Sequence, residues 1–250
     1  MNRLVWAGAL VALLAVPAWA NWFDNFDSYA LGSINGQGGW RGWDGVPAAA
    51  GEVSRDFARS PLQSQKIFGG HDSIHEYTGY TTGMWVYKSY VYTPGNFQSG
   101  GNPNGNFFIM LSRYADGNPG NTNVWTVQMA WNSTNRMIEA DAGSNNKVRV
   151  PYVTDQWAEL KVEIYLNEDW TKIYYNGILF DDPALANHAT LGGGYKWTKG
   201  VFGTSTGPLN IACVDLFANT SSAMYWDDMS LVPEPAALVL LGLALCWRRR

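Results

Sequence analysis

WAELKVEIYLNEDWTKIYYNGILF, residues 157 to 180, carries the alternation of a β-meander. Between residues 160 and 166 every second side chain is apolar, and charged or polar residues stand between them. Because successive strand side chains point to opposite faces, this pattern predicts a strand buried on one side and wet on the other. Asn176-Gly177 is the dipeptide favoured in a two-residue type I′ hairpin. The stretch therefore predicts three antiparallel strands.

A similar pattern of short strands separated by turns extends over most of the chain. Helical periodicity is nearly absent, and Gly, Asn, Ser and Pro interrupt the sequence about every ten residues. This spacing predicts an all-β, antiparallel β-sandwich. Further strands are expected at residues 21–29, 85–92, 107–114, 124–131, 137–140, 147–150, 209–217 and 224–231.

Alternation also predicts which tryptophans lie in the core. In the strand expected at residues 124–131, four apolar side chains share one face, namely Trp125, Val127, Met129 and Trp131. We expect that face to be buried. Trp157 is assigned to the core as well.

The meander resembles the central strands of laminin-G-like and concanavalin A-like jelly rolls, in which the pattern W…(L)xV(E)…(I)YxNG recurs. FDNFDSY and YWDDMSL, in the first and last expected strands, resemble the termini of bacterial extracellular sandwich domains. In those domains the two terminal strands lie side by side. The resemblance implies a jelly-roll domain over residues 21–231.

Both ends of the chain carry targeting patterns. Arg3 precedes an apolar run over residues 4–16, and the small residues Ala18 and Ala20 flank Trp19, as at a signal-peptide cleavage site. We therefore predict a signal helix over residues 1–20 and a mature start at Asn21.

The carboxyl end combines a Pro-Glu-Pro triplet, an uncharged run and a basic terminus: Pro233, Glu234 and Pro235, then residues 236–247, then Arg248, Arg249 and Arg250. As a helix the run covers only about 18 Å, against a hydrocarbon core of about 30 Å. The arginines would stay on the cytoplasmic side. The short hydrophobic helix thus suits transient membrane insertion better than an ordinary short tail anchor.

This order resembles the PEP-CTERM sorting signal of Gram-negative bacteria that make extracellular polysaccharide, over residues 232–250. The resemblance implies recognition by an exosortase and cleavage near the triplet, after export through the Sec translocon and cleavage by signal peptidase. It places the domain at the outer surface of the cell envelope or in the extracellular matrix.

Charge and cysteine content argue against a nucleic-acid-binding protein and against a fold stabilised by disulfides. The net charge is −4, and removing the two signals would take away four arginines and one glutamate. Such an acidic body does not attract phosphate backbones, so no nucleic-acid partner is expected. Cys246 lies in the tail, which leaves Cys213 without a disulfide partner and expected to be buried.

No catalytic residue is predicted. Jelly-roll glycosidases place carboxylates at alternate positions of one strand, and only Glu139 and Asp141 approach that pattern, without a third carboxylate in phase. Glu159 and Glu163 belong to the wet face of the meander. A secreted glycoside hydrolase or polysaccharide lyase that uses scattered residues stays the alternative.

The sequence suggests two kinds of binding site, one for calcium and one for a sugar. Four aspartates of the terminal strands either hold a structural calcium ion, or cap turns or remain solvated: Asp24, Asp27, Asp227 and Asp228. No other cofactor is required, and His71 and His75 are expected to be a loop pair and not a zinc site.

Tryptophans in glycine-rich or turn-rich stretches are the candidates for stacking on sugar rings: Trp40, Trp43, Trp170 and Trp197. The sequence therefore predicts an exported, non-catalytic β-sandwich that binds glycan or serves as a matrix protein, with a polysaccharide as the ligand.

We expect the natively exported protein to begin at Asn21 and to end near the Pro-Glu-Pro triplet, because both terminal segments are removable signals. Intact-mass spectrometry of the exported protein locates both ends at once. A mass that still includes Cys246 and the three terminal arginines would contradict the sorting signal.

Overall fold

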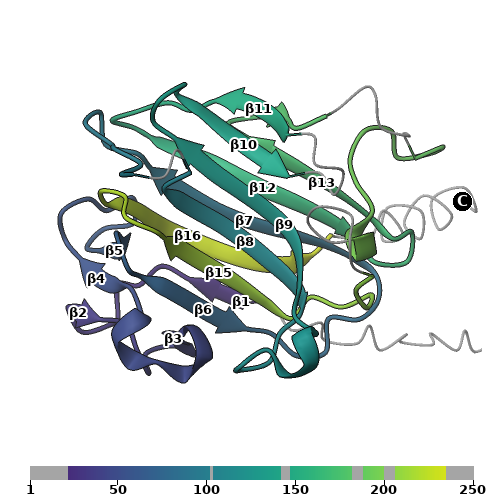
Figure 1. The fold of residues 1–250 in the computed structure, drawn as a ribbon, viewed down its shortest axis with the longest axis horizontal. Coiled ribbons are helices and arrows are strands. Elements are labelled where there is room, and N and C mark those ends of the chain that lie inside the picture. The colour runs from purple at the N-terminus through teal and green to yellow at the C-terminus, as the bar shows by residue number, and fades with distance from the viewer. Residues whose placement is uncertain (1–21, 102–103, 142–146, 182–187, 200–205, 235–250) are drawn as a thin grey trace, which may run out of the picture.

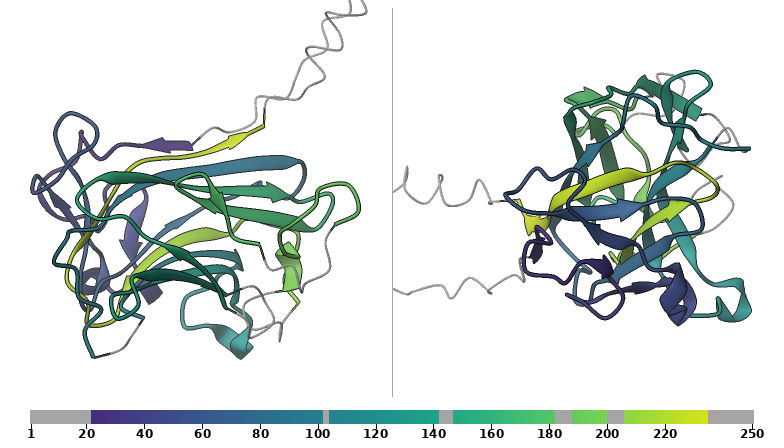
Figure 2. Two further views of the ribbon diagram at one scale, coloured as in Figure 1. Left: turned by 90° about the horizontal axis from the view of Figure 1, so that it is seen from above. Right: turned by 90° about the vertical axis from the view of Figure 1, so that its left-hand side faces the viewer.

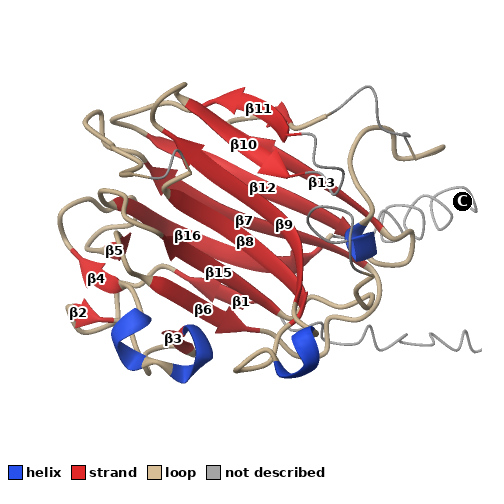
Figure 3. Cartoon of the chain, viewed as in Figure 1, coloured by secondary structure: helices blue, strands red, loops and turns tan. Residues whose placement is uncertain are grey.

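The computed structural model describes residues 22–101, 104–141, 147–181, 188–199 and 206–234. These residues form two antiparallel sheets packed face to face, as predicted (Figure 1). Figure 2 shows the two layers one above the other, and Figure 3 shows that strands dominate and helices are short. None of the helices in the described ranges is long and apolar enough to cross a membrane.

The first sheet has nine strands. Its order is β14 (Ile178–Leu179), β13 (Trp170–Tyr175), β12 (Trp157–Tyr165), β7 (Met84–Tyr92), β16 (Met224–Pro233), β5 (Ser64–Ile67), β4 (Glu52–Ser54) and β2 (Gly32–Ser33), with β1 (Trp22–Asp24) also paired to β16.

The second sheet has seven strands, and four short 3-10 turns accompany the fold. The strand order is β11 (Lys147–Pro151), β10 (Met137–Asp141), β9 (Val124–Asn132), β8 (Asn106–Arg113), β15 (Cys213–Ala218), β6 (Asp72–Glu76) and β3 (Trp40–Gly42). The turns are η1 (Trp43–Gly45), η2 (Pro47–Ala49), η3 (Pro119–Asn121) and η4 (Trp197–Lys199).

The meander forms as its sequence predicts. Strands β12, β13 and β14 pair in order, and the side chains of β12 alternate between half-buried and buried along its length. Asn176 and Gly177 have φ values of 47° and 79°, the left-handed conformation that a type I′ turn requires at both central residues. The third strand, β14, is only two residues long.

The core lies between the two sheets and is rich in aromatic rings. Trp131 of the seven-stranded sheet meets Trp226 of the other sheet edge to face, with ring centroids 5.5 Å apart. Phe108 lies 5.9 Å from the same Trp226 ring. Such rings each bury on the order of 150–250 Å², so they dominate the apolar area removed from water.

Trp125 departs from the predicted core face because of a β-bulge. Met110 pairs with Val127, but the next residue of β8, Leu111, pairs with Trp125. Thr126 is therefore an extra residue, and it turns Trp125 to the outer face of the seven-stranded sheet. The prediction that Trp125 is a core residue is wrong.

Trp157 also leaves the core, although for a different reason. It occupies the half-buried phase of β12 and packs on Tyr92 at 5.5 Å, on the outer face of the nine-stranded sheet. Cys213 is fully buried, as expected.

The first and last strands are neighbours, which confirms the implied arrangement of the termini. Trp22 of β1 pairs with Leu231 of β16 in antiparallel register. Pro233 ends β16 opposite Trp85, and the exposed Glu234 donates its N–H to Met84. The other predicted signal residues lie outside the described residues, namely Ala18, Ala20, Pro235, Arg248, Arg249 and Arg250.

Candidate functional site

The seven-stranded sheet has a second apolar cluster on its outer face. Strand alternation sends Phe108 and Met110 of β8 into the core, whereas Phe107, Ile109 and Leu111 point outward. Half-buried aromatic rings cover this cluster from the neighbouring strands and loops, namely Trp43, Tyr114, Trp125 and Phe217. A contiguous apolar patch on an outer face is a feature of interaction sites.

These residues border a cleft of about 410 Å³, which we call the aromatic cleft. Its lining consists of Trp43, Asp72, Phe107, Ile109, Trp125, Gln128, Asp215 and Phe217. The Trp43 and Trp125 rings are stacked, with centroids 6.0 Å apart and planes 18° from parallel. Small-molecule binding sites are typically clefts of this size, lined mostly by apolar side chains and by a few polar groups.

The loop that carries Trp43 is tied down on both sides. Asp44 donates its N–H to the Tyr114 hydroxyl at 3.0 Å, and its carboxylate accepts the N–H of Gly117 at 2.8 Å. Tyr114 packs against Trp43 in a T-shaped contact at 4.6 Å. The position of the Trp43 ring is therefore set by the loop that follows β8 as well as by its own loop.

Two carboxyl groups lie side by side in the cleft. Asp215 of β15 is only 2% exposed, and its carboxyl forms a hydrogen bond with that of Asp72 from the adjacent strand β6. Burial raises the pKa of Asp72 to about 6. Burial and the neighbouring Asp72 charge raise the pKa of Asp215 well above its ordinary range. The pair therefore holds a shared proton near neutral pH.

The carboxyl pair lacks other donors. The Oδ1 atoms of Asp72 and Asp215 are both buried, and neither accepts a hydrogen bond from a donor among the described residues. A buried acceptor without a donor costs free energy, so two of them in one cleft require an explanation.

Glu139, on the same outer face of the seven-stranded sheet, has the donors that Asp72 and Asp215 lack. It accepts hydrogen bonds from Lys147 at 3.0 Å and Arg149 at 2.9 Å. Burial alone would raise its pKa, but these donors outweigh burial and lower the pKa to about 2. Glu139 is thus a satisfied ion-pair residue, and it shares its face with Asp141, as predicted.

Three of the four tryptophans predicted as candidates for sugar stacking are buried in the fold. The indole N–H of Trp40 donates to Asp24 at 2.8 Å, that of Trp170 to the Gly193 carbonyl at 3.3 Å, and that of Trp197 to the Asn210 carbonyl at 2.9 Å. Of the four, Trp43 lines the aromatic cleft. Sequence reasoning missed Trp125, Asp72 and Asp215, because the strand pairing that unites them is long-range.

The four candidate calcium ligands accept hydrogen bonds from the protein. Asp24 accepts from the Phe26 N–H, the Tyr29 hydroxyl and the Trp40 indole. The other three carboxylates hold loop residues: Asp27 accepts from Leu62 and Gln63, Asp227 from Arg59 and Ser60, and Asp228 from Arg59.

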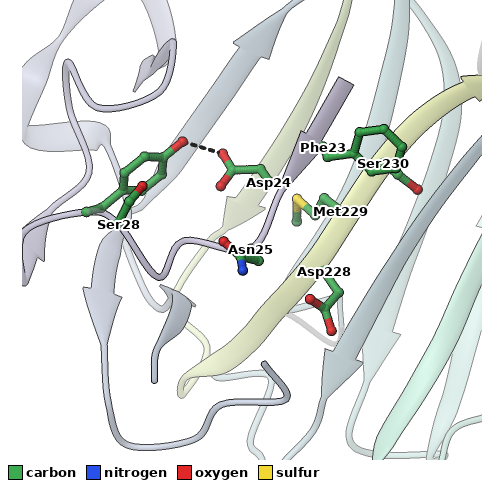
Figure 4. Close-up of a pocket in the computed structure, with 8 residues that line it drawn as sticks. Phe23, Asp24, Asn25, Ser28, Asp228, Met229 and Ser230 are labelled. Atoms are coloured by element: carbon green, nitrogen blue, oxygen red, sulfur yellow. Dashed lines mark hydrogen bonds between the residues drawn. The ribbon is translucent and has the colours of Figure 1, made fainter. Parts of the chain in front are cut away.

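A hollow of about 470 Å³ is lined by residues of β1, of the loop that follows it and of β16, with Asp24 and Asp228 among them. Figure 4 shows the Asp24 carboxyl turned toward the tyrosine hydroxyl and Asp228 pointing another way. Within the described ranges, no three acidic, histidine or cysteine side chains gather in a group that could hold a metal ion. Asp24, Asp27 and Asp227 accept backbone N–H groups of turns and loops, and Asp228 pairs with Arg59.

His71 and His75 do not act as a pair. His75 lies against the rings of Trp22 and Trp40, and burial lowers its pKa to about 4. His71 packs on Phe68, with ring centroids 4.1 Å apart.

The two antiparallel sheets packed face to face define a jelly-roll β-sandwich. The aromatic cleft lies on the outer face of one of these sheets. No family model and no curated protein matches the chain. Among solved structures it is similar to a sialidase, with a TM-score of 0.54 and 8% identity over 87% of this chain. The match spans only 19% of the sialidase chain.

Two further neighbours match over most of both chains. The globular domain of T. cruzi calreticulin has a TM-score of 0.52 and 9% identity, covering 85% of this chain and 90% of that one. The catalytic domain of the glycoside hydrolase family 131 protein from Coprinopsis cinerea has a TM-score of 0.50 and 10% identity, covering 84% and 93%. Likeness at such identities establishes the shared fold.

We expect EDTA and added calcium to leave the melting temperature unchanged, because the aspartate oxygens already accept N–H and O–H groups. Asp24→Ala should cost on the order of 2–4 kcal/mol in both conditions, since buried donors lose their acceptor. Thermal melts check both statements. A calcium-dependent rise that Asp24→Ala removes would restore the calcium prediction.

Asp215→Asn should stabilise the protein at neutral pH. The folded state raises the pKa values of both carboxyls, so their protonation favours folding at low pH, and this contribution is lost as pH rises through the folded pKa of about 6 for Asp72. The asparagine amide supplies a donor to Asp72 and removes one acid. We expect a melting temperature higher by ~3 °C or more at pH 7.5, with the difference shrinking toward pH 4. Glu159→Gln, on the other sheet, is the control, and a less stable Asp215→Asn at pH 7.5 would contradict the assignment.

Proposed function

We propose that this chain is a non-catalytic, glycan-binding β-sandwich and that a sugar unit binds in the aromatic cleft. The observation that carries this proposal is the stacked pair of half-buried indoles, Trp43 and Trp125, beside polar groups that include the buried Asp215. Aromatic faces pack on the apolar faces of pyranose rings, while nearby polar groups fix the hydroxyls.

The polar side of the cleft suits hydroxyl recognition. Gln128 offers both an amide donor and an amide acceptor, and Asp72 and Asp215 offer acceptor oxygens. Because Asp215 is held in the middle of the sheet, between β6 and β8, its position is fixed by strand pairing on both sides. Such preorganisation lowers the entropy cost of binding.

The structural neighbours support a glycan-related role. Two of the three that we report are named as a sialidase and as a glycoside hydrolase catalytic domain. Their likeness concerns the fold, so the ligand proposed here rests on the cleft itself.

A second candidate, a secreted glycoside hydrolase or polysaccharide lyase, is favoured by one observation, the raised pKa of a carboxyl in an aromatic cleft. The geometry of the pair argues against hydrolysis. Asp72 and Asp215 hydrogen-bond to each other, whereas glycosidase carboxyls stand roughly 5–5.5 or 6.5–9.5 Å apart on either side of the scissile bond. Release of reducing sugar would favour the enzyme.

The destination that we propose follows from the terminal sequence signals. The domain is exported through the Sec translocon, trimmed by signal peptidase and an exosortase, and delivered to the surface or matrix of a Gram-negative cell. There the exopolysaccharide is the proposed ligand. A purely structural matrix protein would instead be retained by no member of a polysaccharide array.

Trp43→Ala and Trp125→Ala should each weaken binding to the retained polysaccharide by about tenfold, because each removes one stacking face. Affinity electrophoresis or array retention measures the loss. Trp157→Ala is the matched control, since Trp157 is a half-buried tryptophan on the outer face of the other sheet. If Trp157→Ala weakens binding and Trp125→Ala does not, the aromatic cleft is not the binding site.

A further inference from the structure

The two carboxyl groups of the aromatic cleft are arranged to receive a donor from outside the protein. Asp215 is 2% exposed and lines the cleft, yet its Oδ1 has no donor within the described part of the chain, and the same holds for Oδ1 of Asp72. Carboxylates elsewhere in the fold, such as Asp24, accept several N–H and O–H groups. Other buried polar atoms also lack a partner, but Asp72 and Asp215 are the two carboxyls of this kind that line the aromatic cleft.

The charged groups around the pair leave it negative. Arg41 of the adjacent strand β3 already pairs with Glu76 at 2.6 Å and with Asp116 at 2.9 Å. Lys147 and Arg149 pair with Glu139.

The other titratable neighbours do not neutralise it. Asp44 of η1 adds a negative charge that acts on Asp72. Cys213 of β15 stays a neutral thiol, because burial raises its pKa well above the ordinary value. The pair therefore has no cationic partner among these neighbouring side chains.

We propose that Asp72 and Asp215 select a sugar unit that carries a free amino group, which enters the cleft as an ammonium ion. This inference rests on the proposed function, and it names the class of glycan. The ammonium has three donors, enough for both Oδ1 atoms, and the indole faces of Trp43 and Trp125 also attract a cation. The two carboxyls are specificity-determining residues in this view.

The same arrangement disfavours other sugars. A uronate or a sulfated sugar would bring a second negative charge to a buried acidic pair, which costs binding free energy. N-acetylation removes the positive charge and leaves one amide donor. A neutral glucan can still stack on the indoles and donate hydroxyls, so it should bind more weakly and without charge selectivity.

Binding of the ammonium should release a proton. In the free protein one proton bridges the two carboxyls, and the ligand N–H groups take its place as donors. The displaced proton passes to the buffer, so the complex contains two carboxylates and one ammonium. This exchange predicts that binding releases up to one proton and is weakened by acid and by salt.

Isothermal titration calorimetry of the exported protein at pH 6.5 tests the inference. The probes are four oligosaccharides of equal length: β-1,4-linked glucosamine, its fully N-acetylated form, a neutral β-1,4-glucan and a galacturonan. We expect the glucosamine oligomer to bind about tenfold more tightly than the N-acetylated and neutral oligomers, and the galacturonan to bind weakest. Repeating the titration in buffers of different ionisation enthalpy counts the released protons.

Asp215→Asn and Asp72→Asn should remove the amine preference and the proton release, so that the glucosamine oligomer binds no more tightly than the neutral glucan. Glu159→Gln, which removes a carboxylate from the other sheet, should keep both. If a variant fails to fold, the proton count and salt dependence of the parent protein decide the question alone. Equal binding of the amine and N-acetyl oligomers, or tighter binding of the galacturonan, overturns the inference and leaves the glycan-binding proposal intact. Absence of binding to any polysaccharide overturns both.

Discussion

The structure depends on strand alternation in a sheet that is apolar on both faces. In β8, Phe108 and Met110 fill the space between the sheets, while Phe107 and Ile109 form the floor of the aromatic cleft. Core and cleft are thus built from the same strand, one residue apart. A shift of register by one residue would exchange them, so the fully packed core also fixes which side chains reach the cleft.

A single inserted residue supplements this alternation. The bulge at Thr126 leaves Val127 in the core and turns Trp125 outward, where it stacks on Trp43 from a distant loop. Without the bulge both tryptophans of β9, Trp125 and Trp131, would lie on the core face. The bulge therefore converts core material into half of an aromatic platform, and it locally disrupts the hydrogen-bond ladder between β8 and β9.

The sequence predicts those features that depend on residues close together along the chain. The β12–β14 meander and its Asn176-Gly177 turn follow from local alternation and turn chemistry, and the structure confirms them. Bulges and long-range pairs leave no such local signal: Asp72 and Asp215 are 143 positions apart and meet only because β6 pairs with β15. Glycine-rich surroundings likewise suggested an exposed Trp40, but its chain folds back so that the indole donates to Asp24.

Aspartate side chains have different roles at two places in this structure. At Asp24, three donors from the protein converge on a buried carboxylate and tie the first strand to the loop that follows it and to Trp40 of β3 in the other sheet. At Asp72 and Asp215, the two buried Oδ1 atoms have no donor among the described residues, so a shared proton or a molecule from solution is needed to satisfy them. A fold selected for stability alone would supply a donor or replace one acid. The presence of the pair beside two stacked indoles is therefore the strongest physical reason to place ligand binding on this face of the sheet.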